Sequence, residues 1–423
     1  MRTRQISGVS AWLPVGLLAG FLLLLPFSRW SELPFSLLAL SAPSLLWQQR
    51  EVIRNDPALR RHLRLILWLG LAWCVPMLLS AIDSVAAGKS WTQSLAALRL
   101  PLFAVSVLLL LTTAQQWRWL STLLAAIIGF WVMDGLIQAV TGSNLLGMAA
   151  NGQRLGGIFG ADIWFFGPTL AMLSPLLLEP LWQRKNKLWF LAGLLLTMLV
   201  VLLAGMRAGW LLLPLLVIIY GWRWLRLLPA RQWPQWLLAG LLLVVGVLWL
   251  ASQSDIVQQR WHSSLAVLQT DSDSLQTATT QRWLIWQTAL RMIAANPLNG
   301  VGVRAFPYAY PDYADADDPQ LNRVDGQSRG NRHPHNFWLE ALTDCGVNGL
   351  LGLLLFMGLV LRAWWQADAH GRSRAAAYCF ALLLILFPLN THYALYGTFM
   401  STLIWWLLAM ALAALRRIDR VEI

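Results

Sequence analysis

Residues 188–222 read LWFLAGLLLTMLVVLLAGMRAGWLLLPLLVIIYGW, and this stretch decides the fold class. Two apolar runs, 188–205 and 208–222, lie on either side of Arg207 with almost no loop between them. A helix of about 20 apolar residues crosses the hydrocarbon core of a bilayer, and a shorter run can cross by borrowing flanking residues. The stretch therefore predicts two membrane-spanning helices joined by a tight turn that carries an arginine.

The same pattern recurs along the chain of 423 residues, of which 57% are hydrophobic and only 12% are charged. Soluble globular proteins carry about 25% charged residues, so this composition excludes an ordinary soluble domain. We predict an all-α polytopic membrane protein with about twelve spans. The predicted spans are 11–28, 31–47, 65–83, 93–112, 119–140, 161–180, 188–205, 208–222, 234–251, 337–361, 375–393 and 396–414.

Basic residues predict how these spans are oriented. With the N-terminus in the cytoplasm, 20 of the 32 Lys and Arg residues fall in inside segments, and seven of the others fall in residues 252–335. Short cytoplasmic loops of membrane proteins carry an excess of Lys and Arg, so we predict that both termini are cytoplasmic. This distribution accounts for the net charge of +12, and we therefore expect no nucleic-acid partner.

One segment, 252–335, is polar and holds eight of the 20 acidic residues. It lies between the ninth and tenth predicted spans, on the extracytoplasmic side, and loops of this length are usually functional. The chain therefore falls into three predicted segments. They are 1–251 with spans one to nine, 252–335 as a large extracytoplasmic loop, and 336–423 with spans ten to twelve and a cytoplasmic tail.

This loop is predicted to contain a helix of its own. Residues 280–294 (TQRWLIWQTALRMIA) place apolar side chains on one helical face. Thr279 or Thr280 is suited to cap the start of this helix. The Trp-bearing face predicts a helix that lies on the membrane surface. The side chains on that face are Trp283, Trp286, Leu290 and Ile293.

Two arginines on the extracytoplasmic side are candidate anion ligands. Arg207 lies at the outer membrane boundary, where an unpaired charge costs roughly 3 kcal/mol or more, and Gly205 and Gly209 beside it would allow backbone or substrate to approach. Arg282 lies in the first turn of the surface helix, whose free N–H groups and dipole already attract anions. The alternatives are an arginine that snorkels to the interface and a solvated helix arginine.

The loop enters span ten through Arg329, Arg332, His333 and His335. Positive neighbours disfavour the imidazolium form, so we expect His335 to be neutral and able to accept a proton. His333 is a second candidate in the same turn. Arg154, in the loop before span six, is a further candidate anion ligand.

Other sequence patterns argue against ATP, metals and cofactors. The chain has no Gly-Lys-Ser/Thr phosphate-binding loop, so we expect no ATP. Asp271-Ser272-Asp273 looks like the Asp-x-Asp of metal-dependent glycosyltransferases, but its Ser/Thr/Gln-rich surroundings predict a solvated loop. Asp312 to Asp318 lack the Gly and the terminal Glu of an EF-hand loop. We therefore expect no metal and no cofactor.

The start of span ten resembles the signature of a known membrane-enzyme superfamily. His335-Asn336, nine residues, Gly346, two residues and Gly349 match the pattern His-(Asn/Ser/Gln)-x9-Gly-x-x-(Gly/Thr/Tyr) of the O-antigen ligase and polymerase superfamily at every specified position. The Asn-Pro-Leu-x-Gly-Val-Gly stretch at 296–302 also resembles this superfamily. The resemblance extends over nearly the whole chain, with about twelve helices, both termini inside and one large periplasmic loop.

The resemblance implies a metal-independent, inverting glycosyltransferase of lipopolysaccharide assembly. Its donor would be undecaprenyl-pyrophosphate-linked O-antigen, its acceptor lipid A–core oligosaccharide, and its location the periplasmic face of a Gram-negative inner membrane. The resemblance makes His335 the general base, and Arg207 and Arg282 the pyrophosphate ligands. His333 and Arg154 are second-rank candidates. The superfamily often has Ser or Thr before its boundary arginine, and Met206 departs from this pattern.

Three other functions fit parts of the pattern. An O-antigen polymerase of the same superfamily usually lacks this His signature and has two large periplasmic loops, whereas we predict one here. A protein O-oligosaccharyltransferase commonly has an added C-terminal periplasmic domain, which we do not expect because the sequence ends at Ile423. A lipid or solute transporter needs charges along a path to the cytoplasm. Asp134 and Asp162 are the nearest candidates, and we expect them to pair with local arginines or to face the outer cavity.

Overall fold

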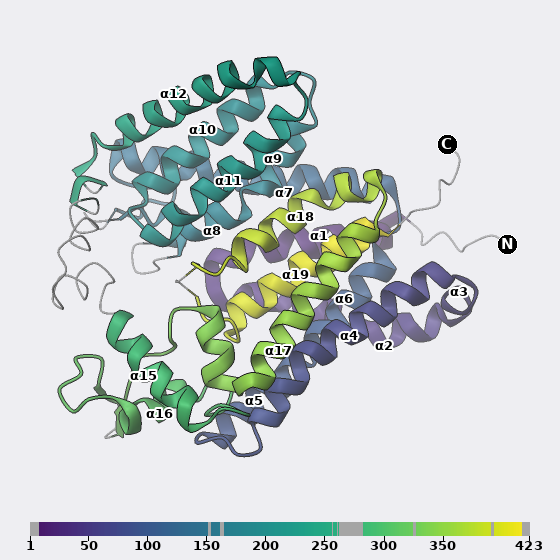
Figure 1. Ribbon diagram of the computed structural model, residues 1–423. Helices are drawn as coiled ribbons and strands as arrows, with labels where there is room; N and C mark the ends of the chain where they lie inside the picture. The colour runs from purple at the N-terminus through teal and green to yellow at the C-terminus, as the bar shows by residue number, and fades with distance from the viewer. Residues whose placement is uncertain are drawn as a thin grey trace. The chain divides into compact units, whose positions relative to one another are not determined.

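The computed structural model describes residues 8–150, 154–160, 165–255, 257–259, 261, 282–324, 327–390 and 393–416. Their regular structure is mostly helical (Figure 1). The exceptions are one short antiparallel hairpin of β1 (Asn322–Val324) and β2 (Gln327–Arg329) and a single bridge between Ser143 and Ala149. The described part of the chain is therefore helical, as its composition predicts. By its internal contacts the chain divides into two compact units, one of 1–120, 279–379 and 391–423, the other of 121–278 and 380–390.

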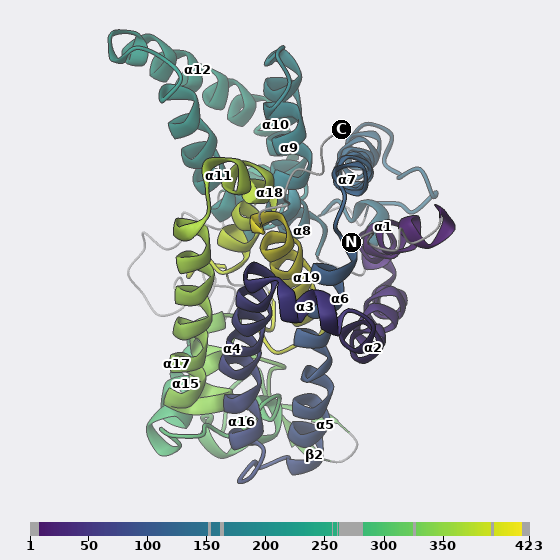
Figure 2. The ribbon, with the colours of Figure 1, turned by 90° about the vertical axis from the view of Figure 1, so that its right-hand side faces the viewer.

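The first unit is a helical bundle. Its helices are α1 (Gly8–Leu24), η1 (Leu25–Ser31), α2 (Glu32–Gln48), α3 (Arg50–Asn55), α4 (Pro57–Ser80), α5 (Ala87–Ala97), α6 (Arg99–Leu110), α15 (Arg282–Ala295), α16 (Phe306–Tyr313), α17 (Phe337–Gln366) and α19 (Thr398–Leu415). α17 packs along α4, and α6 packs against both α2 and α19 (Figure 2). Every side chain of α19 from Met400 to Leu415 is buried, so α19 is the core of this unit.

The second unit is a smaller group of helices. It holds η2 (Gly157–Phe159), α8 (Phe166–Leu173), α9 (Pro175–Trp182), α10 (Leu188–Leu203), α11 (Arg207–Leu225), η3 (Ala230–Gln232) and α12 (Trp233–Ala251). Two further helices, α7 (Ala114–Thr141) and α18 (Ala369–Ile385), run from the first unit into the second. α8 packs against α10 and α11.

Seven segments of the described residues are long and apolar enough to cross a membrane. They are Pro57–Ser80, Ala87–Leu110, Ala114–Thr141, Arg207–Leu225, Ala230–Ala251, Phe337–Gln366 and Thr398–Leu415. Trp12–Phe27 and Leu188–Leu203 are shorter apolar helices. The structure thus confirms a helical protein with several candidate spans, whereas the number of twelve stays a prediction.

The predicted span 161–180 differs from the structure. In place of a single helix over 161–180, the structure has α8 ending at Leu173 and α9 beginning at Pro175. Proline has no amide hydrogen to donate to the preceding turn, so it favours the start of a helix over its interior. Residues 161–164, which include Asp162, lie outside the described residues.

A charged pair inside the first unit ties three helices together. Arg99 forms an ion pair with Glu32 and donates to the Ser36 hydroxyl at 2.9 Å. The Thr402 hydroxyl donates to the other carboxylate oxygen of Glu32 at 3.4 Å. A charge among membrane helices is costly unless it is paired. The pair therefore allows α2, α6 and α19 to pack around charged groups.

Asp56 caps the start of α4. Its carboxylate accepts the Leu59 amide at 2.8 Å and pairs with Arg416 at 2.9 Å. Partial burial raises the pKa of Asp56, but the Leu59 amide and the Arg416 charge outweigh burial, so the pKa is lowered overall. Ionised Asp56 therefore stabilises the fold above an unfolded-state pKa of about 3.9, and this contribution is lost as the pH falls through the lower folded-state pKa.

We expect Asp56→Ala to lower the free energy of unfolding by about 1 kcal/mol at neutral pH, and Asp56→Asn, which keeps a capping oxygen, to lower it less. Thermal unfolding in detergent at neutral and acid pH measures both effects. The difference between Asp56→Asn and the wild type should vanish in acid, where the wild-type carboxyl is also protonated. Exposed Glu51, changed to Gln, is the control. A difference of the same size at both pH values would contradict the role of the charge.

Candidate functional site

The turn that leads into α17 carries both histidines. His335 has a φ of 54°, a left-handed conformation that residues other than glycine seldom adopt. Its amide donates to Nδ1 of His333 at 3.2 Å, and the centroids of the two rings are 4.1 Å apart. Both side chains are half-buried. The turn therefore holds two imidazoles close together. Nδ1 of His333 accepts a hydrogen bond from the amide, so this nitrogen carries no proton of its own.

Asn336, the polar residue of the signature, is the N-cap of α17. Its side-chain oxygen accepts the amides of Trp338 at 2.9 Å and of Leu339 at 3.2 Å. Such a cap satisfies amides that have no partner within the helix. The cap starts α17 directly after His335. It therefore ends the histidine turn, which consists of residues 333–335.

Removing this cap should loosen the turn. We expect Asn336→Ala to lower the free energy of unfolding by about 1 kcal/mol, and Asn336→Asp, which keeps an acceptor oxygen, to stay closer to the wild type. Chemical denaturation in detergent measures the two variants side by side. Equal losses in both variants would show that the capping oxygen is not what Asn336 contributes.

α15 brings Arg282 to the histidine turn. The indole Nε1 of Trp286 donates to the carbonyl of Pro334 at 2.9 Å. Arg282 is the first residue of α15 and lies one turn before Trp286 on the same side of the helix. The Arg282 side chain is half-buried. The structure therefore places Arg282 at the same end of α17 as His333 and His335.

The helix predicted in the large loop exists, and it packs within the protein through a face other than the Trp-bearing one. Ile285, Ala289 and Met292 are buried, whereas Trp283 is 44% exposed and Leu290 is 57% exposed. The buried face packs on Val301, Ala305, Phe306, Ala309 and Tyr310. The Trp-bearing face is thus separate from the face that holds the loop together, and its contact with a membrane stays a prediction. The candidate caps Thr279 and Thr280, and Asp271-Ser272-Asp273, lie outside the described residues.

Hydrogen bonds brace the elements behind α15. The Tyr310 hydroxyl donates to Asp318 at 2.8 Å, and burial raises the pKa of Tyr310, so this hydroxyl stays a donor. Arg291 donates two hydrogen bonds to Asp315, at 2.9 and 3.1 Å, which lower the pKa of that carboxyl. Two carboxylates of the acidic run Asp312–Asp318 are therefore engaged within the loop.

Gly346 of the signature breaks the hydrogen bonding of α17. It has φ 62° and ψ −156°, a region that only glycine commonly occupies. The carbonyls of Thr343 and Asp344 then accept the amides of Val301 at 2.8 Å and Gly302 at 3.1 Å, from the loop that follows α15. The break thus fastens this loop to α17.

The backbone hydrogen bonds between this loop and α17 run in both directions. The amides of Val347 and Asn348, which would bond those two carbonyls in a regular helix, donate to the carbonyls of Pro297 at 2.8 Å and Leu298 at 3.4 Å. Residues 297–302 and the broken turn of α17 therefore satisfy each other's backbone groups. The two stretches that resemble the superfamily, 296–302 and 335–349, are in direct contact.

Gly300 and Gly346 lie where this contact leaves no room for a side chain, and Gly349 lies close to the backbone of its own helix. A Cβ on Gly346 would lie 2.2 Å from the Leu298 carbonyl oxygen, and one on Gly300 would lie 2.4 Å from that of Thr343. A Cβ on Gly349 would lie 2.3 Å from the Ala341 oxygen. These glycines therefore serve backbone packing, and His335 is the residue of the signature that can carry chemistry.

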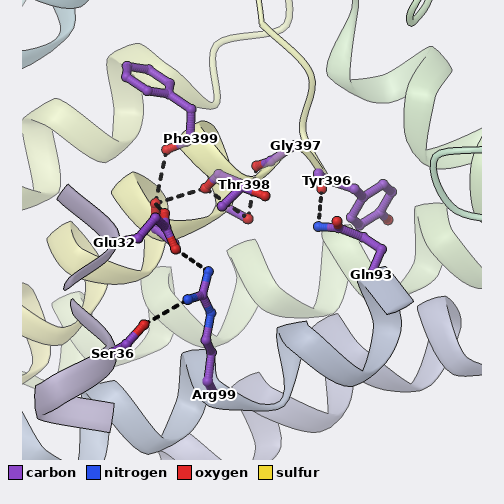
Figure 3. Close-up of polar contacts among 10 residues, drawn as sticks. Glu32, Ser36, Gln93, Arg99, Tyr396, Gly397, Thr398 and Phe399 are labelled. Carbon is purple, nitrogen blue, oxygen red and sulfur yellow. Dashed lines mark hydrogen bonds and ion pairs between the residues drawn. The ribbon is translucent and has the colours of Figure 1, made fainter. Parts of the chain in front are cut away.

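Two carboxylates are buried just inside α17. Glu340 is fully buried, and its oxygens accept the amides of Leu395 at 2.8 Å and Tyr396 at 3.2 Å. Gln93 holds the same segment by donating to the Tyr396 carbonyl at 2.7 Å (Figure 3). Asp344, one turn further along α17, is 1% exposed. Neither carboxylate is among the site residues predicted from the sequence, although an acidic residue within a predicted span is itself a signal.

Arg207 and Arg154 belong to the second unit. Arg207 begins α11 directly after a turn at Gly205, which has a φ of 68°, so the predicted tight turn is confirmed. Both arginines are half-buried. Arg154 precedes η2, which contacts α8. That these two arginines share one site with Arg282 and His335 stays a prediction.

Backbone packing explains the glycine after Arg207. A Cβ on Gly209 would lie 3.2 Å from the backbone carbon of Gly167 in α8. The close approach that the sequence predicts at Gly209 is therefore made by the backbone of a neighbouring helix. This contact holds the start of α11, and with it Arg207, against α8.

Asp134 has a local structural role. It is fully buried, and its carboxylate accepts the Leu145 amide at 2.9 Å. Within the described ranges it forms no ion pair with an arginine, so the pairing expected from the sequence is not found. Asp134 braces the turn that follows α7.

A comparison with protein families agrees with the resemblance seen in the sequence. Residues 192–357 match the family model described as O-antigen ligase. This region is therefore similar to O-antigen ligases. It contains Arg207, Arg282, His333 and His335, whereas Arg154 lies outside it. A comparison with curated proteins found no match to the chain.

Proposed function

We propose that the chain is a glycosyltransferase that moves O-antigen polysaccharide from undecaprenyl pyrophosphate to lipid A–core oligosaccharide. The observation that carries the proposal is the histidine turn of the region that is similar to O-antigen ligases. There, half-buried His335 lies in a left-handed conformation, and the helix of Arg282 is hydrogen-bonded to its turn. Residues in such conformations persist where the surrounding structure holds them, often at functional sites.

His335 is the general base of the proposed reaction. It accepts the proton of an acceptor sugar hydroxyl while that oxygen attacks the anomeric carbon of the donor. The bond from this carbon to the pyrophosphate breaks, and the pyrophosphate leaves with both electrons. A single displacement of this kind inverts the configuration at the anomeric carbon. A product with retained configuration would contradict it.

Arg207 and Arg282 are the proposed ligands of the pyrophosphate, with Arg154 and His333 in supporting roles. A guanidinium presents planar N–H donors that match phosphate oxygens, and it stabilises the charge that develops on the leaving group. No metal or ATP is needed in this scheme. The energy of the transfer comes from breaking the bond between the anomeric carbon and the pyrophosphate of the donor.

The proposed location follows from the charge distribution of the chain. Both termini lie in the cytoplasm, residues 252–335 lie in the periplasm, and the helices cross the inner membrane of a Gram-negative cell. A leaving group that carries a prenyl tail stays in the bilayer, so the reacting groups belong at its outer surface. The observation in favour is that Arg282, His333 and His335 gather at one end of α17.

The purified protein, supplied with lipid-linked O-antigen and lipid A–core oligosaccharide, tests the proposal. We expect capped lipid A–core and free undecaprenyl pyrophosphate in equal amounts, without ATP. Gel electrophoresis and mass spectrometry separate the products. Longer lipid-linked chains with bare lipid A–core would instead identify a polymerase. Transfer to neither saccharide would overturn glycosyl transfer to these acceptors.

A further inference from the structure

Arg304 has the same unusual backbone conformation as His335. Its φ is 62°, and these two are the only non-glycine residues with positive φ in the described part of the chain. Arg304 ends a run in which Gly300, Gly302 and Arg304 all have positive φ. Glycine adopts this conformation without strain, whereas an arginine does not. The strained conformation at Arg304, where a glycine would fit without cost, therefore indicates that the Arg304 side chain has a function.

The backbone around Arg304 is locked on several sides. The Arg304 amide donates to Oδ2 of Asp344 at 2.8 Å. The preceding residue, Val303, donates its amide to Ser80 at 3.1 Å and accepts the Ser90 hydroxyl at 2.8 Å. These contacts hold the left-handed turn against α4, α5 and α17, so the direction of the Arg304 side chain is set in advance.

The guanidinium itself has unused donors. The Arg304 side chain is half-buried, and it forms no hydrogen bond or ion pair within the described ranges. By contrast, Arg99 and Arg291 are paired with carboxylates. A guanidinium carries five N–H donors, and a half-buried one can satisfy them with a ligand.

The surrounding charge decides which ligand fits. The positive charge of Arg304 acts on both Glu340 and Asp344, and both carboxylates are buried. Any negative charge on these carboxylates offsets the guanidinium charge and weakens its attraction for a phosphate. Neutral oxygen acceptors, such as sugar hydroxyls and amide carbonyls, still accept hydrogen bonds from the guanidinium.

We propose that Arg304 binds a saccharide, hydrogen-bonding hydroxyl or carbonyl oxygens of a sugar next to the reacting one. This inference rests on the proposed glycosyl transfer. Glu340, which the Arg304 charge reaches, follows His335 by five residues, or roughly 8 Å along a helix axis. That distance is about the length of one or two sugar rings. The sugar belongs to either the donor or the acceptor, and kinetics can separate the two.

Arg304→Gly is the main test, because glycine accepts the left-handed backbone and removes every donor. Arg304→Lys is the second variant, because it keeps a positive charge beside Glu340 and Asp344 and loses the planar array of donors. With one saccharide saturating, the KM of the other is measured for each enzyme. We expect Arg304→Gly to raise one of the two KM values about tenfold, Arg304→Lys to raise the same one less, and kcat to stay within about twofold.

The identity of the affected substrate shows which sugar Arg304 binds. A rise in the donor KM assigns Arg304 to O-antigen, and a rise in the acceptor KM assigns it to the core oligosaccharide. The rise should be the same at low and high salt, because a neutral contact is not screened. A rise that disappears at high salt would show an anion contact and overturn the saccharide assignment.

Controls separate this role from a structural one. Arg291→Ala removes an exposed arginine of the same loop and should leave both KM values unchanged. If Arg304 only neutralised Glu340 and Asp344, Arg304→Gly would lower the unfolding temperature and the amount of active enzyme, with both KM values unchanged in both variants. That result would overturn the inference. Transfer by the wild type in the same assay keeps the proposed function standing even then.

Discussion

Replacing His335 by asparagine is expected to lower kcat about 10²- to 10⁴-fold, the usual contribution of a general base. Asparagine tolerates a left-handed backbone better than most residues, so the φ of 54° at this position can be kept. The amide cannot take up the proton of a sugar hydroxyl. The loss should therefore appear in kcat at saturating donor and acceptor, with the unfolding temperature close to that of the wild type.

The pH dependence gives an independent measure of the same role. If a neutral imidazole accepts the proton, the wild-type rate falls as the pH is lowered between about 7.5 and 5, where imidazole becomes protonated. The residual rate of His335→Asn should not show this fall. His370→Asn, at an exposed histidine of α18, is the matched control and should leave rate and profile unchanged. A His335→Asn enzyme with near wild-type kcat would remove His335 from the chemistry.

Replacing Gly346 by alanine is expected to lower the free energy of unfolding by about 3 kcal/mol or more. The backbone there has φ 62° and ψ −156°, and the added Cβ would lie 2.2 Å from the carbonyl oxygen of Leu298. Neither the strain nor the clash can relax without separating residues 297–302 from α17. The four exchanged hydrogen bonds between these segments would weaken together.

Chemical denaturation in detergent measures this loss, with Gly358→Ala as the matched control. Gly358 lies in the same helix, and a Cβ on it would meet nothing within 4 Å, so that variant should be neutral or slightly stabilising. Activity per folded molecule should also fall in Gly346→Ala, because the loop carries Arg304. Wild-type stability in Gly346→Ala would contradict the packing role of the signature glycine.

Local sequence patterns anticipated most of the elements. Apolar runs give the helices, because a membrane span must satisfy its backbone internally and its length follows from bilayer thickness. The helix of Arg282 appears within two residues of its predicted start, since its apolar spacing is a local property. Pro175 divides a predicted span, and its effect could have been read from the sequence.

The site could be predicted only in part. His335 and Asn336 belong to the superfamily signature. The resemblance that rests on this signature also implied that Arg207 and Arg282 are pyrophosphate ligands. The pattern did not show that Asn336 caps a helix or that Gly346 breaks one, because both depend on which groups lie opposite. Nothing local to Arg304 shows its left-handed backbone, which is held by Asp344, 40 residues away.

By itself the sequence determined a helical membrane protein with a large polar loop and a signature histidine. These features depend on composition, on residue spacing and on the thickness of a bilayer, which act along the chain. The tertiary structure alone decided which face of α15 is buried, how residues 297–302 join α17, and which carboxylates the charge of Arg304 acts on. Those outcomes depend on contacts between segments far apart in sequence, where each backbone group must find a partner once water is excluded.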